Sequence, residues 1–215
     1  MCSKQRRRSI TTTSQPTQER LRQFFKTLNR FMLLMWRLGF GSYMNRPQLS
    51  GRIMVLTHSG RKTGLRRQTP VNFAIVDGEV YCVAGFGSGS DWYRNLLAEP
   101  QVEVWLPSGW WAGIADDISD SPQRIHIIRQ VMIASGFAAR LAGIDPLRMS
   151  AEELAEASAS YPLIHIRRVE ARTGPGGPGD LAWVWPWTTS ILLMLLLFRP
   201  KSRRLRNIRG SRENL

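Results

Sequence analysis

The sequence predicts a mainly β, α+β domain in which a small antiparallel barrel is surrounded by helices. Six short apolar runs with strand-like patterning lie between residues 52 and 169, tight-turn signals join several of them, and helical patterns flank the set. Closing such a sheet on itself removes its unpaired edges from solvent, which favours a barrel. The 215 residues, 43% of them hydrophobic, suffice for one domain of ordinary size with tails.

The first ordered element expected is an amphipathic helix from Thr17 to about Phe40. It follows a polar, basic tail over residues 1–16 that we expect to be disordered. Apolar side chains recur along the helix at spacings of three and four. Cations are interleaved with this stripe: Arg20, Arg22, Lys26, Arg30 and Arg37. Such a helix either packs on the domain or lies in a lipid interface, and both alternatives stay open.

Strands and turns then follow at short spacing. Asp77-Gly78 is a two-residue hairpin signal, and Pro107-Ser108-Gly109 joins a second pair of strands. The strands expected from the apolar runs are Arg52–Thr57, Thr69–Val76, Val80–Ala84, Gln101–Leu106, Trp110–Ile118 and Leu163–Val169. Two helices are expected before the last strand. Ser121-Pro122 starts one that runs to about Ser135, and a capping box at Ser150 starts the other.

The C-terminal part differs in composition. Residues 171–180 form a Gly/Pro linker, so the barrel domain is expected to span 17–170. The following segment, 181–215, begins with 18 uncharged residues that contain three tryptophans and ends in a basic tail. We expect Pro186 to break its helix, which leaves Ile191–Leu197 short for crossing about 30 Å of hydrocarbon. Shallow membrane insertion is favoured, with packing on the domain or between subunits as the alternative.

The net charge of +14 is concentrated at the ends of the chain. Residues 1–26 and 199–215 each carry +6, which leaves only +2 between them. A nearly neutral body argues against a nucleic-acid-binding face, whereas basic tails suit an anionic membrane surface. Cys2 lies in a tail and Cys82 in an expected buried strand, so cysteine usage fits a reducing cytoplasm. The N-terminus lacks the apolar core of a secretory signal.

A basic loop follows the first expected strand. Ser59-Gly60-Arg61-Lys62-Thr63-Gly64 precedes Arg66 and Arg67, so four cations lie within seven residues between two strands. Cations held on a short loop can bind a phosphate or a carboxylate with little loss of entropy. The alternative is a basic hairpin that faces water. The spacing is not that of a P-loop, and no helix follows.

A glycine-rich loop follows the third expected strand. Glycines alternate over residues 84–90, which leaves backbone N–H groups accessible, and Ser90 or Asp91 can cap a following helix. Trp92 and Asn95 lie one helical turn apart on that helix and face the same way. The alternative is a surface loop before an ordinary core helix.

Together, the two loops resemble the deazaflavin-dependent nitroreductase family. The resemblance rests on Thr57–Gly64 with Arg67, Thr69 and Pro70, then on Ser90–Leu96 and Glu99-Pro100 with Val102 and Val104. It covers roughly residues 29–169 and implies a split β-barrel of the FMN-binding-like type. It also implies coenzyme F420, a deazaflavin that carries a phosphate and an oligoglutamate tail, and hydride transfer to an electron-poor acceptor such as a quinone, enone or nitro compound.

The resemblance assigns cofactor contacts residue by residue. The cations Arg61, Lys62 and Arg67 would meet the phosphate and tail, and Thr63, Thr69 and Pro70 would shape the strand beside them. The cofactor ring would be cradled by Ala84, Gly85, Phe86, Gly87 and Ser88, with Trp92 and Asn95 supporting that wall. Many family members carry a His-Pro pair where this chain has Ser90-Asp91, so the path of this loop is open.

Catalytic residues are not apparent, because aligning a ring with its acceptor needs no ionised nucleophile. Tyr161 and Tyr43 are candidates for donating a proton or hydrogen bond to the acceptor, with core packing as the alternative. His58, His126 and His165 lack partners at metal-ligand spacing, so no metal site is assigned.

The sequence therefore predicts an F420-dependent oxidoreductase acting on a small-molecule acceptor. We expect a cytoplasmic enzyme, peripheral at the inner face of the cell membrane, that reduces a membrane quinone. Dimerisation is expected by analogy with other small split barrels. Three alternatives stay open: a split-barrel enzyme with FMN or FAD, a non-catalytic cofactor-binding protein, and a nucleic-acid-binding protein, which the neutral body makes the least favoured.

Overall fold

The computed structural model describes residues 27–43, 45 and 51–198. The chain divides into two compact units, the first ending at Leu181 and the second beginning at Ala182. The expected tails over 1–16 and 199–215, and the first part of the expected helix, lie outside the described residues.

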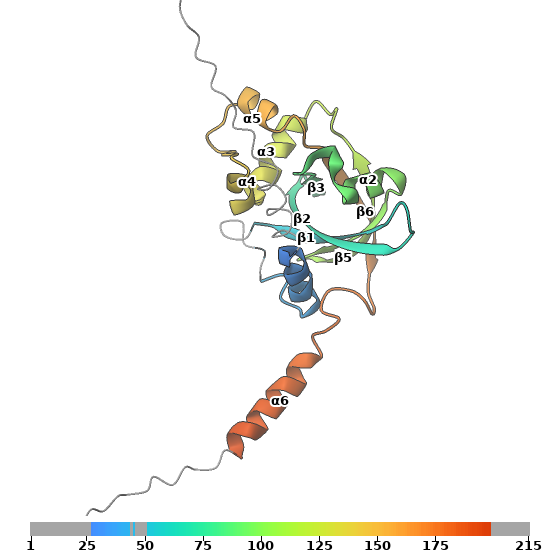
Figure 1. Cartoon of the computed structure of the whole chain (residues 1–215), viewed down its shortest axis with the longest axis vertical. Coiled ribbons are helices and arrows are strands. Elements are labelled where there is room, and N and C mark those ends of the chain that lie inside the picture. Colours follow the sequence, from blue (N-terminus) through green and yellow to red (C-terminus); the bar gives the residue numbers. More distant parts are fainter. Residues whose placement is uncertain (1–26, 44, 46–50, 199–215) are drawn as a thin grey trace, which may run out of the picture. The chain divides into compact units, whose positions relative to one another are not determined.

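Six strands of the first unit close into an antiparallel barrel (Figure 1). The strands are β1 (Ile53–Ser59), β2 (Arg66–Val76), β3 (Glu79–Val83), β4 (Gln101–Leu106), β5 (Gly109–Asp117) and β6 (Leu163–Arg172). Their order around the barrel is β1-β2-β3-β6-β5-β4. The expected barrel with peripheral helices is thus confirmed. β6 extends to Arg172, two residues into the segment expected to be a linker.

The hairpin between β2 and β3 has the geometry that Asp77-Gly78 predicts. Both residues have positive φ, 51° at Asp77 and 83° at Gly78. A two-residue turn with positive φ at both positions matches the right-handed twist of the strands it joins. This turn fixes the register in which Val76 faces Glu79 and Phe73 faces Cys82.

Apolar side chains fill the barrel and also cover one outer side of it. Helix α2 (Asp91–Ala98) contributes Tyr93 and Leu96 to the inner core. Helices α3 (Arg124–Ala134), α4 (Phe137–Leu141) and α5 (Ala151–Ala157) gather on one side of the barrel (Figure 1). Their core includes Ile128, Leu154 and Leu163, which are fully buried.

The two helix starts predicted in this region have different outcomes. The capping box at α5 is confirmed, because the Glu153 N–H donates to Ser150 Oγ and the Ser150 N–H donates to the Glu153 carboxylate. The Ser121-Pro122 start is wrong. Helix α3 begins at Arg124 after Gln123, without a side-chain cap, and Ser121 Oγ instead accepts from the Gln123 N–H in the preceding turn.

The described part of the N-terminal helix, residues 27–37, packs on the barrel. Trp36 is 4% exposed and lies against Val55 and Trp105, with the two indole ring centroids 6.5 Å apart. Arg37 forms an ion pair of 2.9 Å with Asp180. Of the two alternatives for this helix, packing on the domain therefore applies to residues 27–37.

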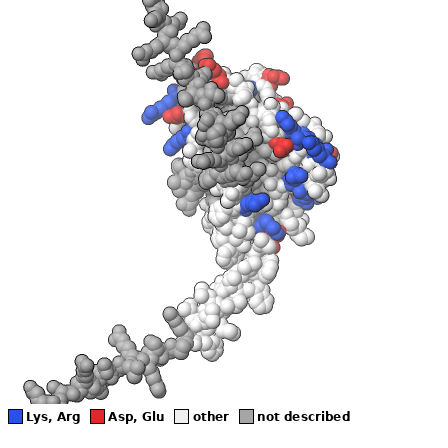
Figure 2. All heavy atoms as spheres, in the orientation of Figure 1, with Lys and Arg blue, Asp and Glu red and all other residues white. Residues whose placement is uncertain are grey.

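The second unit contains helix α6 (Val184–Leu197). The prediction that Pro186 breaks the helix is wrong. It occupies the third helical position, where the missing N–H would have had no acceptor within the helix. Residues 182–198 carry no charge and form the white run in Figure 2. Among the described residues, no helix combines the length and apolarity needed to cross a membrane.

Candidate functional site

A cleft of about 1050 Å³ opens beside the barrel. Its walls come from the N-terminal helix, from β1, β2 and the loop between them, from the glycine-rich loop with α2, and from α3 and α4. The two loops singled out in the sequence lie 20 or more residues apart, and both line this cleft. The barrel thus assembles into one site the two segments on which the family resemblance rests.

The cleft lies where the inner faces of β1 and β2 change from apolar to polar. Alternate residues of a strand share one face. On β1 the inward-facing Met54 and Leu56 are followed by His58, and on β2 Phe73 and Val71 are followed towards the loop by Thr69. Because α2 fills the end of the barrel with Tyr93 and Leu96, these polar side chains are held at the boundary between core and cleft.

The basic loop is a compact turn over residues 60–65. The Gly60 N–H donates to the Leu65 carbonyl at 2.9 Å, and the Gly64 N–H donates to the Gly60 carbonyl at 2.7 Å. Lys62 and Arg67 are exposed and line the cleft. In the part of the chain that the structure describes, neither side chain has a hydrogen-bond or ion-pair partner. These two cations are available to an anionic ligand.

Arg61 has a different role from its two neighbours. Its guanidinium donates to Asn95 Oδ1 at 2.9 Å and to the Asp91 carboxylate at 3.1 Å, so it joins the basic loop to the start of α2. Its hydrogen bond to Asp91 holds the pKa of that carboxyl below its usual range. One of the three cations predicted to meet the phosphate and tail is thus already engaged with protein groups.

A chain of buried polar groups continues from Arg61 into the barrel mouth. Asn95 Nδ2 lies 3.2 Å from His58 Nδ1, and His58 Nε2 lies 3.2 Å from Thr69 Oγ1. His58 and Asn95 are each 3% exposed. Burial lowers the pKa of His58 below 6.5. A backbone hydrogen bond at Ser59 raises this pKa in part, and the charge of Arg67 lowers it further. The sequence did not assign His58 a role, because its partners come from other elements.

The glycine-rich loop contributes an open wall. Gly85 lines the cleft, and a Cβ placed there would meet no atom within 4 Å, so the missing side chain leaves space. Among the described residues, the Gly85 N–H donates to no backbone carbonyl. Gly87 has a φ of +70°, which disfavours any larger residue, and it starts the short helix η1 (Gly87–Gly89).

Ser90 takes the expected position before α2 but does not cap it with its side chain. No hydrogen bond joins Ser90 Oγ to the helix, and this buried oxygen has no partner among the described residues. Asp91, the other capping candidate, is the first residue of α2 and pairs with Arg61. Ser90 lines the cleft, so a bound polar group can satisfy its hydroxyl.

The helices contribute mainly apolar side chains to the cleft. The lining side chains there are Leu28 and Met32 of the N-terminal helix, Met132 of α3, and Phe137 and Leu141 of α4. Sequence reasoning missed this wall, because apolar side chains at helical spacing give no sign of whether they face a core or a cleft. Phe137 and Leu141 are 40% and 64% exposed, which distinguishes them from core residues.

Most of the predicted site residues meet in this cleft. Those that line it are Arg61, Lys62, Thr63, Arg67, Thr69, Pro70, Gly85, Phe86, Trp92, Asn95 and Tyr161. Ala84, Gly87 and Ser88 belong to the adjoining loop but are not among the lining residues, and Ala84 is fully buried. Of the two candidate tyrosines, Tyr161 faces the cleft, whereas Tyr43 is 74% exposed and lies against Phe40 outside it.

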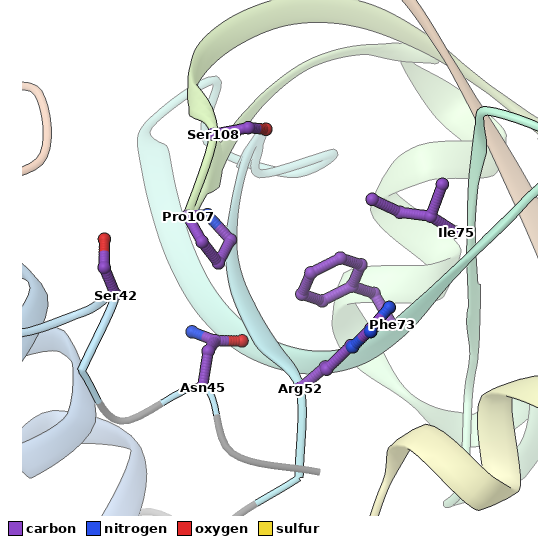
Figure 3. Close-up of a pocket in the computed structure, with 7 residues that line it drawn as sticks. All are labelled: Ser42, Asn45, Arg52, Phe73, Ile75, Pro107 and Ser108. Atoms are coloured by element: carbon purple, nitrogen blue, oxygen red, sulfur yellow. The ribbon is translucent and has the colours of Figure 1, made fainter.

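A second hollow of about 300 Å³ is lined by Phe73, Ile75, Pro107 and four polar residues (Figure 3). Its Asn45 donates to the Gly41 carbonyl at 2.8 Å and accepts from the Ile53 N–H at 2.7 Å, so its amide serves the backbone. Arg52 is the one cation among the described residues that line it. None of the predicted site residues lines this hollow.

Fold and cleft define the class of the protein, a six-stranded antiparallel β-barrel with a large cleft beside the barrel. The sequence model of the F420H2-dependent quinone reductase family matches residues 40–150, more than half of the chain. The chain belongs to this family. It is therefore an F420-dependent oxidoreductase, as the resemblance of its two loops predicts.

Several solved structures are similar at low identity. A conserved hypothetical protein from Mycobacterium tuberculosis is 20% identical over 58% of this chain and 75% of that one, with a TM-score of 0.40. An F420H2-dependent reductase is 20% identical over 54% and 94%, with a TM-score of 0.41. An F420 reductase is 18% identical over 61% and 94%, with a TM-score of 0.40.

The residues of the cleft fit F420. Lys62 and Arg67, which have no ion-pair partner among the described residues, match the phosphate and the carboxylates of its tail. The space left open at Gly85 and the partnerless Ser90 hydroxyl suit a planar ring with polar edges. The cleft volume lies just above the range of about 300–1,000 Å³ found for drug-sized ligands, which leaves room for a larger cofactor.

Proposed function

We propose that this enzyme binds F420 in the large cleft and reduces a lipid-soluble quinone there. The proposal rests on one observation: the cleft has a basic wall and an apolar wall. Unpaired cations, Lys62 and Arg67, lie on the basic loop, while apolar side chains of α3, α4 and the N-terminal helix line another wall. An anionic cofactor tail and an apolar acceptor need these two kinds of surface in one site.

Each group of residues has a task in this proposal. Reduced F420 supplies the hydride when it is bound. Lys62 and Arg67 hold its anionic groups, and Arg61 fixes the loop that carries them to α2. Gly85 and Phe86 form the wall against the ring, while Met132, Phe137 and Leu141 exclude water from the acceptor. Tyr161, which lines the cleft, would donate a hydrogen bond or proton to the acceptor oxygen.

Turnover tests this assignment. The enzyme is mixed anaerobically with reduced F420 and a short-chain quinone, and reappearance of the oxidised cofactor is followed by its absorbance, with a nitro compound as a second acceptor. Quinone-dependent oxidation in proportion to enzyme concentration supports the proposal. Binding without turnover makes the protein a carrier, and preferential binding of FMN places it among the flavin-dependent split barrels. Tyr161→Phe is expected to lower kcat with little change in F420 affinity.

We further propose that the second unit anchors the enzyme to an anionic membrane surface. Helix α6 buries none of its residues, and the side chains of Ile191 to Phe198 are all more than half exposed. Its 14 residues measure about 21 Å, less than the hydrocarbon thickness of a bilayer, which suits partial insertion. Tryptophans precede the apolar run and the basic residues of 199–215 follow it, as at a lipid interface.

Vesicle flotation tests the anchor. Full-length protein should float with anionic vesicles, less with neutral ones, and protein lacking 1–26 and 181–215 should not float. Leu193→Glu places one charge in α6 and should weaken flotation without changing turnover of a soluble quinone. Equal flotation of the full-length and truncated proteins would contradict the proposal. Dimerisation stays a prediction, to be checked by the mass of the full-length protein in solution.

A further inference from the structure

The donors and acceptors in the polar chain at the barrel mouth can be assigned from the two ends of the Asn95 amide. Asn95 Oδ1 accepts two hydrogen bonds from Arg61, from the backbone N–H at 3.2 Å and from the guanidinium at 2.9 Å. The carbonyl oxygen of this amide therefore faces the basic loop. Its Nδ2, which can only donate, faces His58 Nδ1 at 3.2 Å.

The orientation of Asn95 determines the tautomer of His58. A ring nitrogen that accepts from an amide N–H carries no proton, so the proton of a neutral imidazole lies on Nε2. The neutral ring is favoured because His58 is 3% exposed and lies near the cation Arg67, and in the described residues no carboxylate pairs with it. The Nε2–H then donates to Thr69 Oγ1 at 3.2 Å.

The tautomer of His58 determines the hydrogen bonds that the Thr69 hydroxyl can form. Its hydroxyl oxygen accepts from His58, so its hydrogen is free to donate, and Thr69 lines the cleft on the same strand as Arg67. We propose that His58 is a positioning residue whose Nε2-protonated ring turns the Thr69 hydroxyl into a hydrogen-bond donor toward an anionic or carbonyl oxygen of the ligand in the cleft. This inference rests on the proposed function for the identity of the ligand, but the tautomer itself does not.

Thr69 thereby gains a role beyond that of shaping its strand. A hydroxyl in a protein rotates to suit its surroundings and can accept or donate. Here the hydrogen bond from His58 occupies one lone pair of the oxygen, so the hydroxyl hydrogen points away from the ring and can donate. The donor is oriented before the ligand arrives, which lowers the cost of binding.

The tautomer can be measured without a ligand. The chain has only three histidines, so ¹⁵N NMR of labelled protein gives few imidazole signals, and loss of one set in His58→Gln assigns His58. We expect a protonated Nε2 and an unprotonated Nδ1 at neutral pH. A protonated Nδ1, or an imidazolium, would overturn the inference whether or not F420 binds.

A double-mutant cycle measures the coupling to the ligand. F420 is titrated by fluorescence into wild type, His58→Phe, Thr69→Val and the double variant, with His126→Phe as a control at an exposed histidine. Thr69→Val should weaken binding about tenfold, as the loss of one hydrogen bond to a charged acceptor does. His58→Phe should weaken binding several-fold in wild type and have little further effect beside Thr69→Val.

Each unexpected result of these experiments leads to a different conclusion. If His58→Phe weakens binding equally in both backgrounds, His58 acts by packing alone and the inference is wrong. Thr69→Ser keeps the hydroxyl and should restore affinity, whereas a loss like that of Thr69→Val would contradict the inference. If wild type does not bind F420, the proposed function fails, and the NMR result still decides the tautomer.

Discussion

Removing the two unpaired cations of the cleft should weaken F420 binding without affecting the fold. A hydrogen bond to a charged group contributes ~1.5 to 3 kcal/mol, and an exposed ion pair less than ~1 kcal/mol. Because Lys62 and Arg67 are exposed, we take about 1 kcal/mol for each. Lys62→Ala/Arg67→Ala together should then raise the Kd about 30-fold.

The assay is a fluorescence titration with F420 at low and high salt, beside a thermal melt. The difference between wild type and the double variant should shrink as salt screens the charges. The melting temperature should not change, since neither side chain has a partner in the described residues. Arg148→Ala, at an exposed arginine that does not line the cleft, is the control. Unchanged affinity in the double variant, or an equal loss in the control, would refute the assignment.

Three further predictions follow from the described contacts. Asn95→Leu should lower the free energy of unfolding by about 2 kcal/mol and weaken F420 binding, because it removes the buried hydrogen bonds of Asn95 to Arg61 and His58. Chemical denaturation measures the change in the free energy of unfolding. The pKa of His58 is near 6.5 in the unfolded state and lower in the folded state, so the free energy of unfolding should fall as the pH drops below 6.5. This fall should be smaller in His58→Gln, and thermal melts across this pH range measure it. Ser150→Ala should cost about 1 kcal/mol of stability and leave F420 affinity unchanged, because the capping box lies outside the cleft.

The sequence predicted the barrel well because its signals are local. Alternating apolar residues and the Asp77-Gly78 turn report the strands directly, and all six strands are present. Helix boundaries were less predictable. A serine followed by proline also suits a turn, which is what Ser121 forms before α3. Pro186 was expected to end a helix, but in the first turn it breaks no hydrogen bond.

The site was predictable where its residues are contiguous in sequence. The basic loop and the glycine-rich loop both reach the cleft. What the sequence could not give is which residues pair across elements. Arg61 is engaged with α2, and His58 is joined to Asn95, 37 residues away. The apolar wall of α4 was also missed, because its distinguishing property is exposure rather than composition.

The proposed function requires that F420 occupies the large cleft beside the glycine-rich loop. Gly85→Leu tests it most directly, because the added side chain meets no protein atom at its Cβ and projects from a lining position. F420 and FMN are titrated into wild type, Gly85→Ala and Gly85→Leu, with melting temperatures measured in parallel. We expect wild type to prefer F420, Gly85→Ala to bind nearly as well, and Gly85→Leu to lose binding with an unchanged melting temperature. Wild-type affinity in Gly85→Leu would place the cofactor elsewhere and contradict the account.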